Sequence, residues 1–494
     1  MVFLIYNYFY NVSGAFMNTL ILDGIFQNND VTLTDNSKTT LDYIISKIDR
    51  TLFERVILLQ TGTITTVPDT VKNVVIENKT IGVILKSILK ESKNSDNIVI
   101  HTSGNPFFDI QYVKTMIDRH EKYVADYTYS IGFPDFLVPQ IITPNCLKNL
   151  ITLCGENQEI RDDYLFYAIS KDINSFDIET FISKHDLRLY RISFGTYGKP
   201  EKIFLDNLLN SISPDTTYDD LVDYLLKNQH LFYTTVYGAF FEITTVSNTE
   251  PIYYPAKNSP DVFCDPVQFD RVLVTLQTMN PHIKIIFNGR GDPLRHPDFI
   301  TMVTSVIEKK LELIIETDGY CVTDNITEAL NDFKENITFV IKIDAFSDET
   351  YKKIHNGYDL NIPKAAFTLL KNKGFTTYRQ IVRMTCNEDD IEALLKNKDM
   401  ENLILRKYSQ YCGTLPDRKV VDLSPLKRFP CYHIRREISF TPDLAIQLCM
   451  YSNEKLHCTV DDAPDVYKKE FISQTKAEYR ECCKNCDDYY IFNF

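Results

Sequence analysis

Five cysteines in the carboxyl-terminal part of this chain have spacings that suit metal binding. Cys483 and Cys486 form a CxxC pair, whose spacing lets two thiolates chelate one metal. Cys431 and Cys449 flank an expected hairpin, "REISF", "TPD" and "LAIQL", which would bring its two ends together. These four thiols are enough for zinc or a [4Fe–4S] cluster, with Cys482 as a competitor for the Cys483 position. Spacing alone does not separate the two metals from a reduced, metal-free tail.

The other seven cysteines occur singly in strand-like or helix-like segments. We expect them to be small buried hydrophobic groups. They are Cys146, Cys154, Cys264, Cys321, Cys386, Cys412 and Cys458. A disulfide framework is not expected in a cytoplasmic chain, because that compartment keeps thiols reduced.

A glycine-containing loop lies between a strand and a helix in "IKIIFNGRGDPLRHPDF" (283–299). Gly289, Gly291 and Pro293 stand where a chain needs tight turns and close backbone approach to a ligand. An ordinary strand-to-helix loop would use the same residue types. The loop alone therefore leaves a ligand site and a structural turn equally open.

Four segments together resemble the core of radical S-adenosylmethionine (radical SAM) enzymes. "GRGDPLRHPDF" is similar to the glycine-rich loop of that family, and "IIETDG" resembles its later strand ending in Thr-Asn-Gly. "IKIDAFSDETYKKIHNG" resembles the fourth-strand signature, and "EITTVSN" resembles the first strand. The resemblance implies degenerate S-adenosylmethionine loops at Gly289, Gly291, Asp292, Pro293 and Thr317, with Asp292 in place of the usual Glu.

The three cluster cysteines of that family, spaced CxxxCxxC, are missing. The matching positions hold Ser247, Pro251 and Tyr254. Iron–sulfur clusters require soft thiolate ligands, and Pro has no side-chain donor. We therefore expect a radical SAM barrel without the usual radical chemistry, and binding of S-adenosylmethionine is doubtful.

The cysteine-rich tail resembles the SPASM/twitch extension that follows radical SAM barrels and binds auxiliary [4Fe–4S] clusters. This resemblance favours iron–sulfur over zinc at Cys431, Cys449, Cys483 and Cys486. Leu444 stands where the family usually has Gly, and the chain ends eight residues after Cys486. One cluster, as in the shorter twitch form, is therefore the most that we expect. With its ending "CDDYYIFNF" and its cysteine-free barrel loop, the chain is similar to the spiro-SPASM family.

The amino-terminal part resembles the sugar-nucleotide cytidylyltransferases, which have a GT-A-like α/β fold. The similarity lies in "HTSGNPFFDIQYVKTMIDRHEKYVADYTYSIGFPDF". Gly104, between Ser103 and Asn105, occupies the position of the family's magnesium-binding Asp. Asp23 and Asp109 remain as candidates, but magnesium-bound triphosphate needs hard oxygen ligands and a phosphate-binding cation. We therefore expect a structural or binding domain rather than an active transferase.

Charge and hydropathy limit the class of partner. The net charge of −14 argues against nucleic acid, because phosphate binding needs clustered Lys and Arg. The apolar first sixteen residues lack the positive charge of a signal peptide, and we expect translation to start at Met17. No segment is expected to span a membrane, so a cytoplasmic location is predicted.

Strand-like and helix-like segments alternate in two regions, which predicts an α/β fold with mainly parallel sheets. Strands are expected near 19–24, 55–62, 73–78, 97–103 and 126–132, and again near 240–246, 283–289, 311–319, 338–344, 378–384 and 402–408. We expect four domains. They are a cytidylyltransferase-like α/β domain (17–154), a helical connector (155–235), a partial (β/α)6 radical-SAM-like barrel (236–421) and a SPASM/twitch iron–sulfur domain (422–494).

Three functional hypotheses follow. The first is a protein that binds one [4Fe–4S] cluster and serves electron transfer, redox sensing or presentation of a protein, peptide or sugar partner. The second is a nucleotidyl- or sugar-nucleotide-processing enzyme that uses the amino-terminal domain. The third is a zinc-stabilised scaffold. The sequence does not decide whether the chain is an enzyme, but radical SAM catalysis is not expected.

Overall fold

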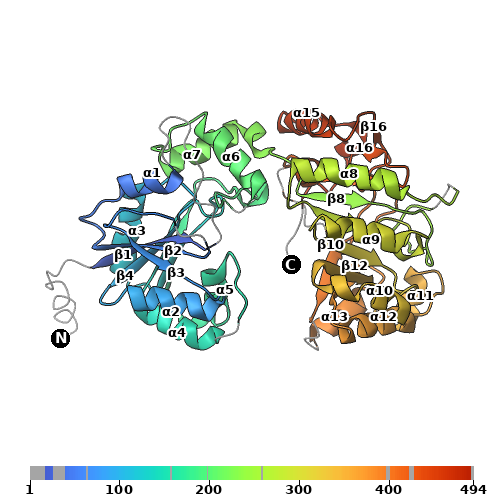
Figure 1. Ribbon diagram of the computed structural model, residues 1–494, viewed down its shortest axis with the longest axis horizontal. Coiled ribbons are helices and arrows are strands. Elements are labelled where there is room, and N and C mark those ends of the chain that lie inside the picture. Colours follow the sequence, from blue (N-terminus) through green and yellow to red (C-terminus); the bar gives the residue numbers. More distant parts are fainter. Residues whose placement is uncertain are drawn as a thin grey trace. The chain divides into compact units, whose positions relative to one another are not determined.

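The computed structural model divides the chain into two compact units, Met1–Leu231 and Phe232–Phe494 (Figure 1). It describes residues 17–25, 39–62, 65–155, 158–196, 198–256, 260–396, 401–421, 425 and 428–490. The expected start region before Met17 and most of the loop after Asp23 lie outside the described residues. No helix in the described ranges is long and apolar enough to cross a membrane.

The first unit contains a seven-stranded sheet in the order β3-β2-β1-β4-β6-β5-β7. Its strands are β1 (Asn18–Gly24), β2 (Arg55–Gln60), β3 (Lys72–Val75), β4 (Asn97–Thr102), β5 (Tyr127–Ile131), β6 (Gln140–Ile142) and β7 (Ile178–Ile182). All pairs are parallel except those that β6 makes with β4 and β5. The five predicted strands are present, while β6 and β7 were not anticipated. β7 lies in the segment expected to be a helical connector.

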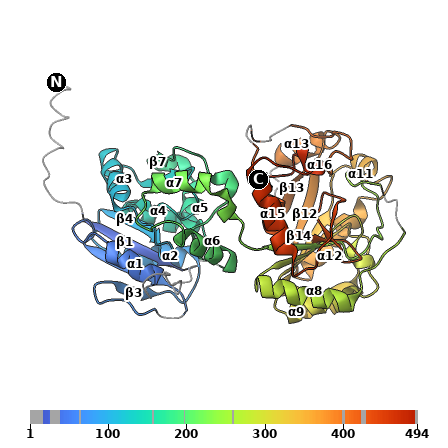
Figure 2. The ribbon, with the colours of Figure 1, turned by 90° about the horizontal axis from the view of Figure 1, so that it is seen from above.

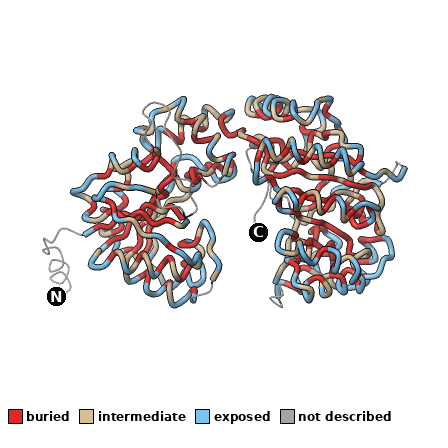
Figure 3. The backbone as a smooth tube through the Cα atoms, in the orientation of Figure 1, coloured by how far each residue is buried: buried red, intermediate tan, exposed pale blue. Residues whose placement is uncertain are grey.

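Helices pack on both faces of this sheet because its central strands are apolar on both faces. Leu20 and Leu22 belong to one core, while Ile21 between them belongs to the other. The helices are α1 (Thr40–Lys47), α2 (Ile81–Glu91), α3 (Ile110–Lys122), α4 (Pro144–Cys154), α5 (Tyr164–Ser170), α6 (Lys199–Leu209) and α7 (Tyr218–Lys227). Figure 3 shows the resulting burial of the strands and the exposed outer surfaces of the helices.

The second unit contains a nine-stranded sheet in the order β13-β12-β11-β10-β9-β8-β14-β15-β16. Its first six strands in sequence are parallel: β8 (Gly238–Phe241), β9 (Lys284–Phe287), β10 (Leu313–Thr317), β11 (Ile337–Lys342), β12 (Thr376–Arg383) and β13 (Leu403–Lys407). The six strands expected for a partial barrel are therefore all present. Their carboxyl ends meet at one edge, where such folds place their sites.

Helices follow these strands and cover the outer face of the sheet, with α8, α9 and α12 visible in Figures 1 and 2. They are α8 (Pro266–Met279), α9 (Phe299–Glu308), α10 (Asp324–Ala329), α11 (Asp348–Ile354), α12 (Asn361–Asn372) and α13 (Glu388–Lys396). Side-chain caps begin several of them. The hydroxyl of Thr323, for example, accepts the backbone N–H of Ile326 at the start of α10.

The cysteine-rich tail extends the barrel sheet. β14 (Glu437–Phe440) pairs in parallel with β8, and β15 (Ile446–Gln447) and β16 (Lys455–Leu456) follow in antiparallel order. The predicted hairpin is thus present, with Leu444 of its turn at φ 59°. The tail helices are α14 (Tyr432–Arg436), α15 (Ala463–Thr475) and α16 (Glu481–Lys484). Pairing of β14 with β8 places the tail against the barrel, which the sequence did not indicate.

Candidate functional site

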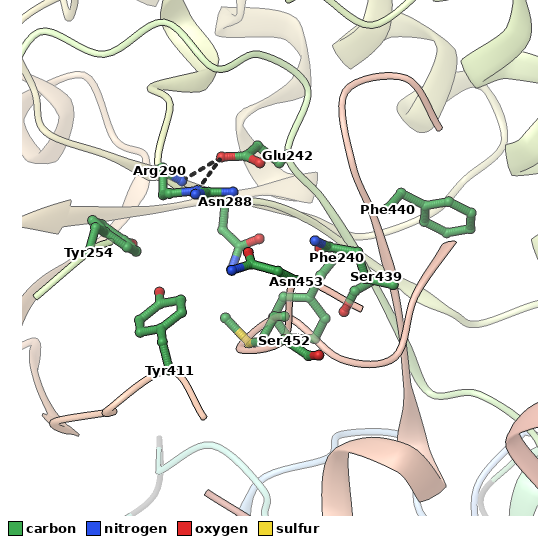
Figure 4. Close-up of a pocket in the computed structure, with 13 residues that line it drawn as sticks. Phe240, Glu242, Tyr254, Asn288, Arg290, Tyr411, Ser439, Phe440, Ser452 and Asn453 are labelled. Atoms are coloured by element: carbon green, nitrogen blue, oxygen red, sulfur yellow. Dashed lines mark hydrogen bonds and ion pairs between the residues drawn. The ribbon is translucent and has the colours of Figure 1, made fainter. Parts of the chain in front are cut away.

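Two loops at the carboxyl edge of the barrel interlock through the glycines of the predicted ligand loop. The Glu242 carboxylate, just after β8, accepts the backbone N–H of Arg290 at 2.8 Å (Figure 4). It also accepts the backbone N–H of Gly291 at 3.4 Å. A Cβ on Gly291 would lie 1.9 Å from the carbonyl oxygen of Thr244, and Gly289 has φ 128°. Both glycines are therefore required by the packing of one loop on the other.

Asp292, the expected cofactor-binding carboxylate, is buried and hydrogen-bonded within the protein. Its Oδ2 accepts the hydroxyl of Thr317 (2.7 Å) and the backbone N–H of Asp318 (2.9 Å). Its Oδ1 accepts the backbone N–H of Leu294 (2.9 Å), one residue into the short 3₁₀ turn that begins at Pro293. The structure thus brings Asp292, Pro293 and Thr317 together, and the carboxylate joins β9 to β10.

Asp318 is a buried carboxyl group beside this network. Burial, followed by the neighbouring charge of Asp292, raises the pKa of Asp318 to about 8. The side chains of Asn248 (3.2 Å) and Thr249 (3.4 Å) contact its two oxygens. Asp318 takes the Asn position of the family's Thr-Asn-Gly, so its place in the motif was the signal that could have identified it. Near neutral pH the Asp318 carboxyl therefore retains its proton.

The three positions of the missing cluster cysteines lie around one cavity of about 420 Å³. Ser247 donates its hydroxyl to the carbonyl of Thr249 (2.7 Å), and the ring of Tyr254 packs edge-on against Tyr411 at 5.9 Å (Figure 4). No cysteine is among the described residues that line the cavity. The side chains at this loop therefore offer a cluster no thiolate.

A buried group of three side chains, Tyr253, Asp344 and His355, fixes the same loop to the segment that follows β11. Asp344 Oδ2 accepts the hydroxyl of Tyr253 (2.8 Å) and lies 3.0 Å from His355 Nε2. Its Oδ1 accepts the backbone N–H of Val382 (2.8 Å). This network was not anticipated, because Tyr253 lies far in the sequence from Asp344 and His355 and no spacing rule connects them.

The four predicted cluster ligands lie close enough to affect one another. Burial raises the pKa of the Cys431 thiol to about 12. Burial also raises the pKa of Cys449, with further contributions from Cys431, Cys486 and Cys483. Among the described residues, no three His, Cys, Asp or Glu side chains converge as a metal site. The four thiols are nevertheless neighbours in the fold.

Cys482 and Cys412 stand beside this group in different ways. Cys482 Sγ lies 3.8 Å from Cys483 Sγ and 3.3 Å from a carboxylate oxygen of Glu454, to which it can donate. Cys412, in the loop after β13, lies beside Cys486, and this neighbour lowers the pKa of Cys486. Sequence spacing had placed Cys412 among the isolated cysteines. No linear motif connects it to the tail, and only the fold reveals its position.

In the first unit, the residues next to Gly104 serve the fold. Asn105 donates to the carbonyls of residues 136 and 137 and accepts the backbone N–H of Phe107 (3.0 Å). Asp109 caps α3 through Tyr112 N–H (3.0 Å) and also accepts the backbone N–H of Tyr218 (3.2 Å). Both side chains are thus used in structural hydrogen bonds.

Asp23 lines a small cavity of about 40 Å³ together with Asp162 and Asp163. It accepts the hydroxyl of Tyr164 (3.0 Å), and burial raises its pKa. No lysine or arginine is among the described residues that line this cavity. The described residues at this cavity therefore supply no phosphate-binding cation of the kind that a nucleotidyltransferase needs.

Comparison with protein families identifies one domain. Residues 255–397 match the Radical SAM superfamily model. The second unit therefore carries a radical SAM superfamily domain, and the match begins directly after Tyr254. It includes neither the positions of the missing cysteines nor the tail.

An uncharacterised protein of Treponema pallidum (strain Nichols) is 26% identical over 365 residues, covering 67% of this chain and 99% of the relative. Among solved structures, Streptococcus suis SuiB bound to the precursor peptide SuiA covers 56% of this chain and 76% of its own, with a TM-score of 0.43 and 13% identity. A cytidylyltransferase from Leptospira borgpetersenii covers 44% of this chain and 97% of its own, with a TM-score of 0.36 and 15% identity.

Proposed function

We propose that this protein is an iron–sulfur protein that binds one [4Fe–4S] cluster through Cys431, Cys449, Cys483 and Cys486. The observation that carries the proposal is that Cys431, Cys483 and Cys486 all lie near the Cys449 thiol, whose pKa is raised first by burial and then by these three neighbours. Cys431 is the N-cap of α14, the helix that leads into β14, and Cys449 follows β15, while Cys483 and Cys486 lie on and after α16. Four thiolates are the usual complement of a cubane cluster.

When bound, such a cluster supplies one-electron redox chemistry. The protein supports this by burial, because Cys431 and Cys449 lie in a low-dielectric region. The backbone N–H of Asp488 is 3.4 Å from Cys486 Sγ, a hydrogen bond of the kind that tunes cluster potentials. Electron transfer, or sensing of redox state, is the role that this arrangement supports best.

We further propose that the barrel does not cleave S-adenosylmethionine. Ser247, Pro251 and Tyr254 offer no thiolates, so an iron site open to the cofactor has no protein ligands there. Asp292 already accepts three hydrogen bonds within the protein, which leaves it poorly placed to receive an ammonium group. Isothermal titration with S-adenosylmethionine should show no saturable binding, and micromolar affinity would contradict this part of the proposal.

The cluster is tested by iron, sulfide and zinc analysis of anaerobically purified protein, with low-temperature EPR after reduction. We expect about four irons and about four sulfides per chain. The double variant Cys483→Ser/Cys486→Ser should lose both, together with the EPR signal. Cys458→Ser, a substitution of the same kind in the same tail, should retain them.

Two outcomes would contradict the proposal. Zinc without sulfide would make the tail a zinc-stabilised scaffold, since zinc accepts the same four thiolates. Full iron and sulfide in the double variant would place the cluster on other residues. Cys412→Ser tests whether Cys412 is a cluster ligand or only a neighbour of the ligands, because only the loss of a ligand removes iron.

A further inference from the structure

Arg428, three residues before Cys431 in the sequence, has a side chain that reaches the CxxC pair. Its Nη1 donates to the carbonyl of Lys484 (2.8 Å), and its Nη2 donates to the carbonyl of Cys483. Lys484 and Cys483 are the last two residues of α16, and the last carbonyls of a helix lack helical partners. A basic side chain at the carboxyl end of a helix commonly satisfies them. Arg428 thus completes the hydrogen bonding of the helix that carries Cys483.

The carbonyl of Cys483 joins the Arg428 side chain to the CxxC turn. This oxygen accepts the backbone N–H of Cys486 at 3.2 Å as well as the guanidinium of Arg428. A carbonyl oxygen has two lone pairs and can accept both donors. The conformation of the turn, and with it the separation of the Cys483 and Cys486 thiols, therefore depends on where the Arg428 side chain is held.

Two tyrosine rings hold the guanidinium. Its Cζ atom lies 4.2 Å from the ring centre of Tyr479 and 4.9 Å from that of Tyr489. Arginine packs well on aromatic faces because its guanidinium is planar and weakly hydrated. The carbonyl of Tyr489 also accepts the backbone N–H of Tyr432 (2.8 Å), the residue after Cys431. The Arg428 side chain therefore connects the segment of Cys431 to the segment of the CxxC pair.

The positive charge of Arg428 differs from that of its neighbours in lacking a carboxylate partner among the described residues. Both of its hydrogen-bond acceptors are neutral carbonyl oxygens. Lys407 and Lys419, in contrast, are paired with the carboxylate of Asp487 at 3.2 Å and 2.6 Å. The charge of the guanidinium is therefore available to balance negative charge on the nearby thiols.

We propose that Arg428 positions the CxxC pair and that its guanidinium favours the reduced form of the cluster proposed above. One-electron reduction adds a negative charge at the four thiols, and a fixed cation nearby stabilises that charge. The redox part of this inference rests on the proposed function. The positioning part concerns only residues of this chain and is measurable without a cluster.

Hydrogen exchange with mass spectrometry tests the positioning role on the full-length protein as purified anaerobically, whether or not it holds iron. Arg428→Ala should speed exchange in residues 481–486 at least about fivefold, because the turn loses its charged hydrogen bonds. Lys476→Ala removes an exposed cation from the same tail and should leave this exchange unchanged. Circular dichroism checks folding, and Arg428→Met, which keeps the apolar stem, replaces Arg428→Ala if that variant does not fold. Unchanged exchange in the folded variant would overturn the positioning role.

A redox titration followed by EPR tests the role of the charge. Arg428→Gln keeps a donor but loses the charge, so at a fixed potential its ratio of reduced to oxidised cluster should fall about tenfold. For a one-electron couple this is a reduction potential lower by about 59 mV. Arg428→Lys retains the charge and should stay near the wild-type potential, as should Lys476→Gln, whose exposed charge is screened by water.

The outcomes separate this inference from the proposed function. Equal potentials in the wild-type protein and Arg428→Gln would overturn the redox part. If folded Arg428→Gln holds no iron, retention of iron in Arg428→Lys would support the role of the charge, and loss of iron from both variants would overturn it. Absence of iron from the wild-type protein would contradict the proposed function itself. The redox part would then fail with it, and the exchange measurement would still decide the positioning role.

Discussion

The network of Tyr253, Asp344 and His355 allows a quantitative test of how the cluster-less loop is held. Tyr253→Phe removes only the hydroxyl that donates to Asp344 Oδ2 at 2.8 Å. All three side chains are buried. A hydrogen bond to a carboxylate contributes about 1.5–3 kcal/mol, and its loss leaves a buried acceptor partly unsatisfied. We expect the second unit to lose about 1.5–3 kcal/mol of unfolding free energy.

Tyr233→Phe is the matched control. Tyr233 belongs to the same unit and is buried, but its hydroxyl has no hydrogen-bond partner among the described residues. Removing an unsatisfied buried hydroxyl should be neutral or stabilising. The two variants delete the same atom, so they differ only in the hydrogen bond.

Urea unfolding followed by pulsed hydrogen exchange and mass spectrometry measures the second unit separately from the first. With an m-value of about 3 kcal/mol/M, Tyr253→Phe should lower the urea midpoint of the second unit by about 0.5–1 M. Equal midpoints for Tyr253→Phe and Tyr233→Phe would refute the reasoning. Exchange in residues 250–256 should also rise in Tyr253→Phe alone, because the loop loses its attachment.

Three further predictions concern the same unit. Because burial and Asp292 raise the pKa of Asp318 to about 8, its carboxyl binds a proton more tightly in the folded state than when unfolded, so stability should fall as pH rises from about 4 to about 8. Asp318→Asn should remove that fall, as measured by thermal unfolding across this pH range. Leu444 has φ 59°, a left-handed backbone conformation that glycine adopts without strain. Leu444→Gly should therefore be about 1 kcal/mol more stable than Leu444→Ala in urea titrations. Gly291→Ala should cost about 3 kcal/mol or more in unfolding free energy, because its Cβ meets a backbone oxygen at 1.9 Å.

The controls for these predictions come from the same chain. Gly198→Ala should have little effect, since the nearest atom to its Cβ is the flexible end of Glu201 at 3.3 Å. Equal effects of the two glycine substitutions would show that the two barrel loops do not interlock as described. A pH profile unchanged in Asp318→Asn, or an alanine at position 444 as stable as glycine, would contradict the respective argument.

Much of the architecture could be predicted from local patterns. The strands β1, β2 and β4 are continuous apolar runs, and such runs are recognisable because both of their faces are buried. The glycines at 289 and 291 were identified as positions of close approach, although the partner is the Glu242–Thr244 loop rather than a ligand. The hairpin of the tail was likewise predicted from its turn residues.

Other features left no local signal. β6 has three residues and pairs antiparallel between β4 and β5, which is too short to produce a periodic pattern. β7 is only partly apolar because it lies at the edge of its sheet. Both β6 and β7 form because they pair with neighbouring strands, and those pairs exist only in the folded sheet.

The sequence by itself determined the α/β class, the two strand-rich regions, the absence of cluster cysteines at positions 247, 251 and 254, and the presence of a CxxC and a hairpin in the same tail. These properties depend on residue type and short spacing. The tertiary structure alone decided that β14 pairs with β8 and that Cys412 lies beside Cys486. It also decided that the Asp292 carboxylate accepts hydrogen bonds from Thr317 and Asp318. Such contacts join residues far apart in the chain, and their free energy depends on burial and geometry that exist only once the strands have assembled.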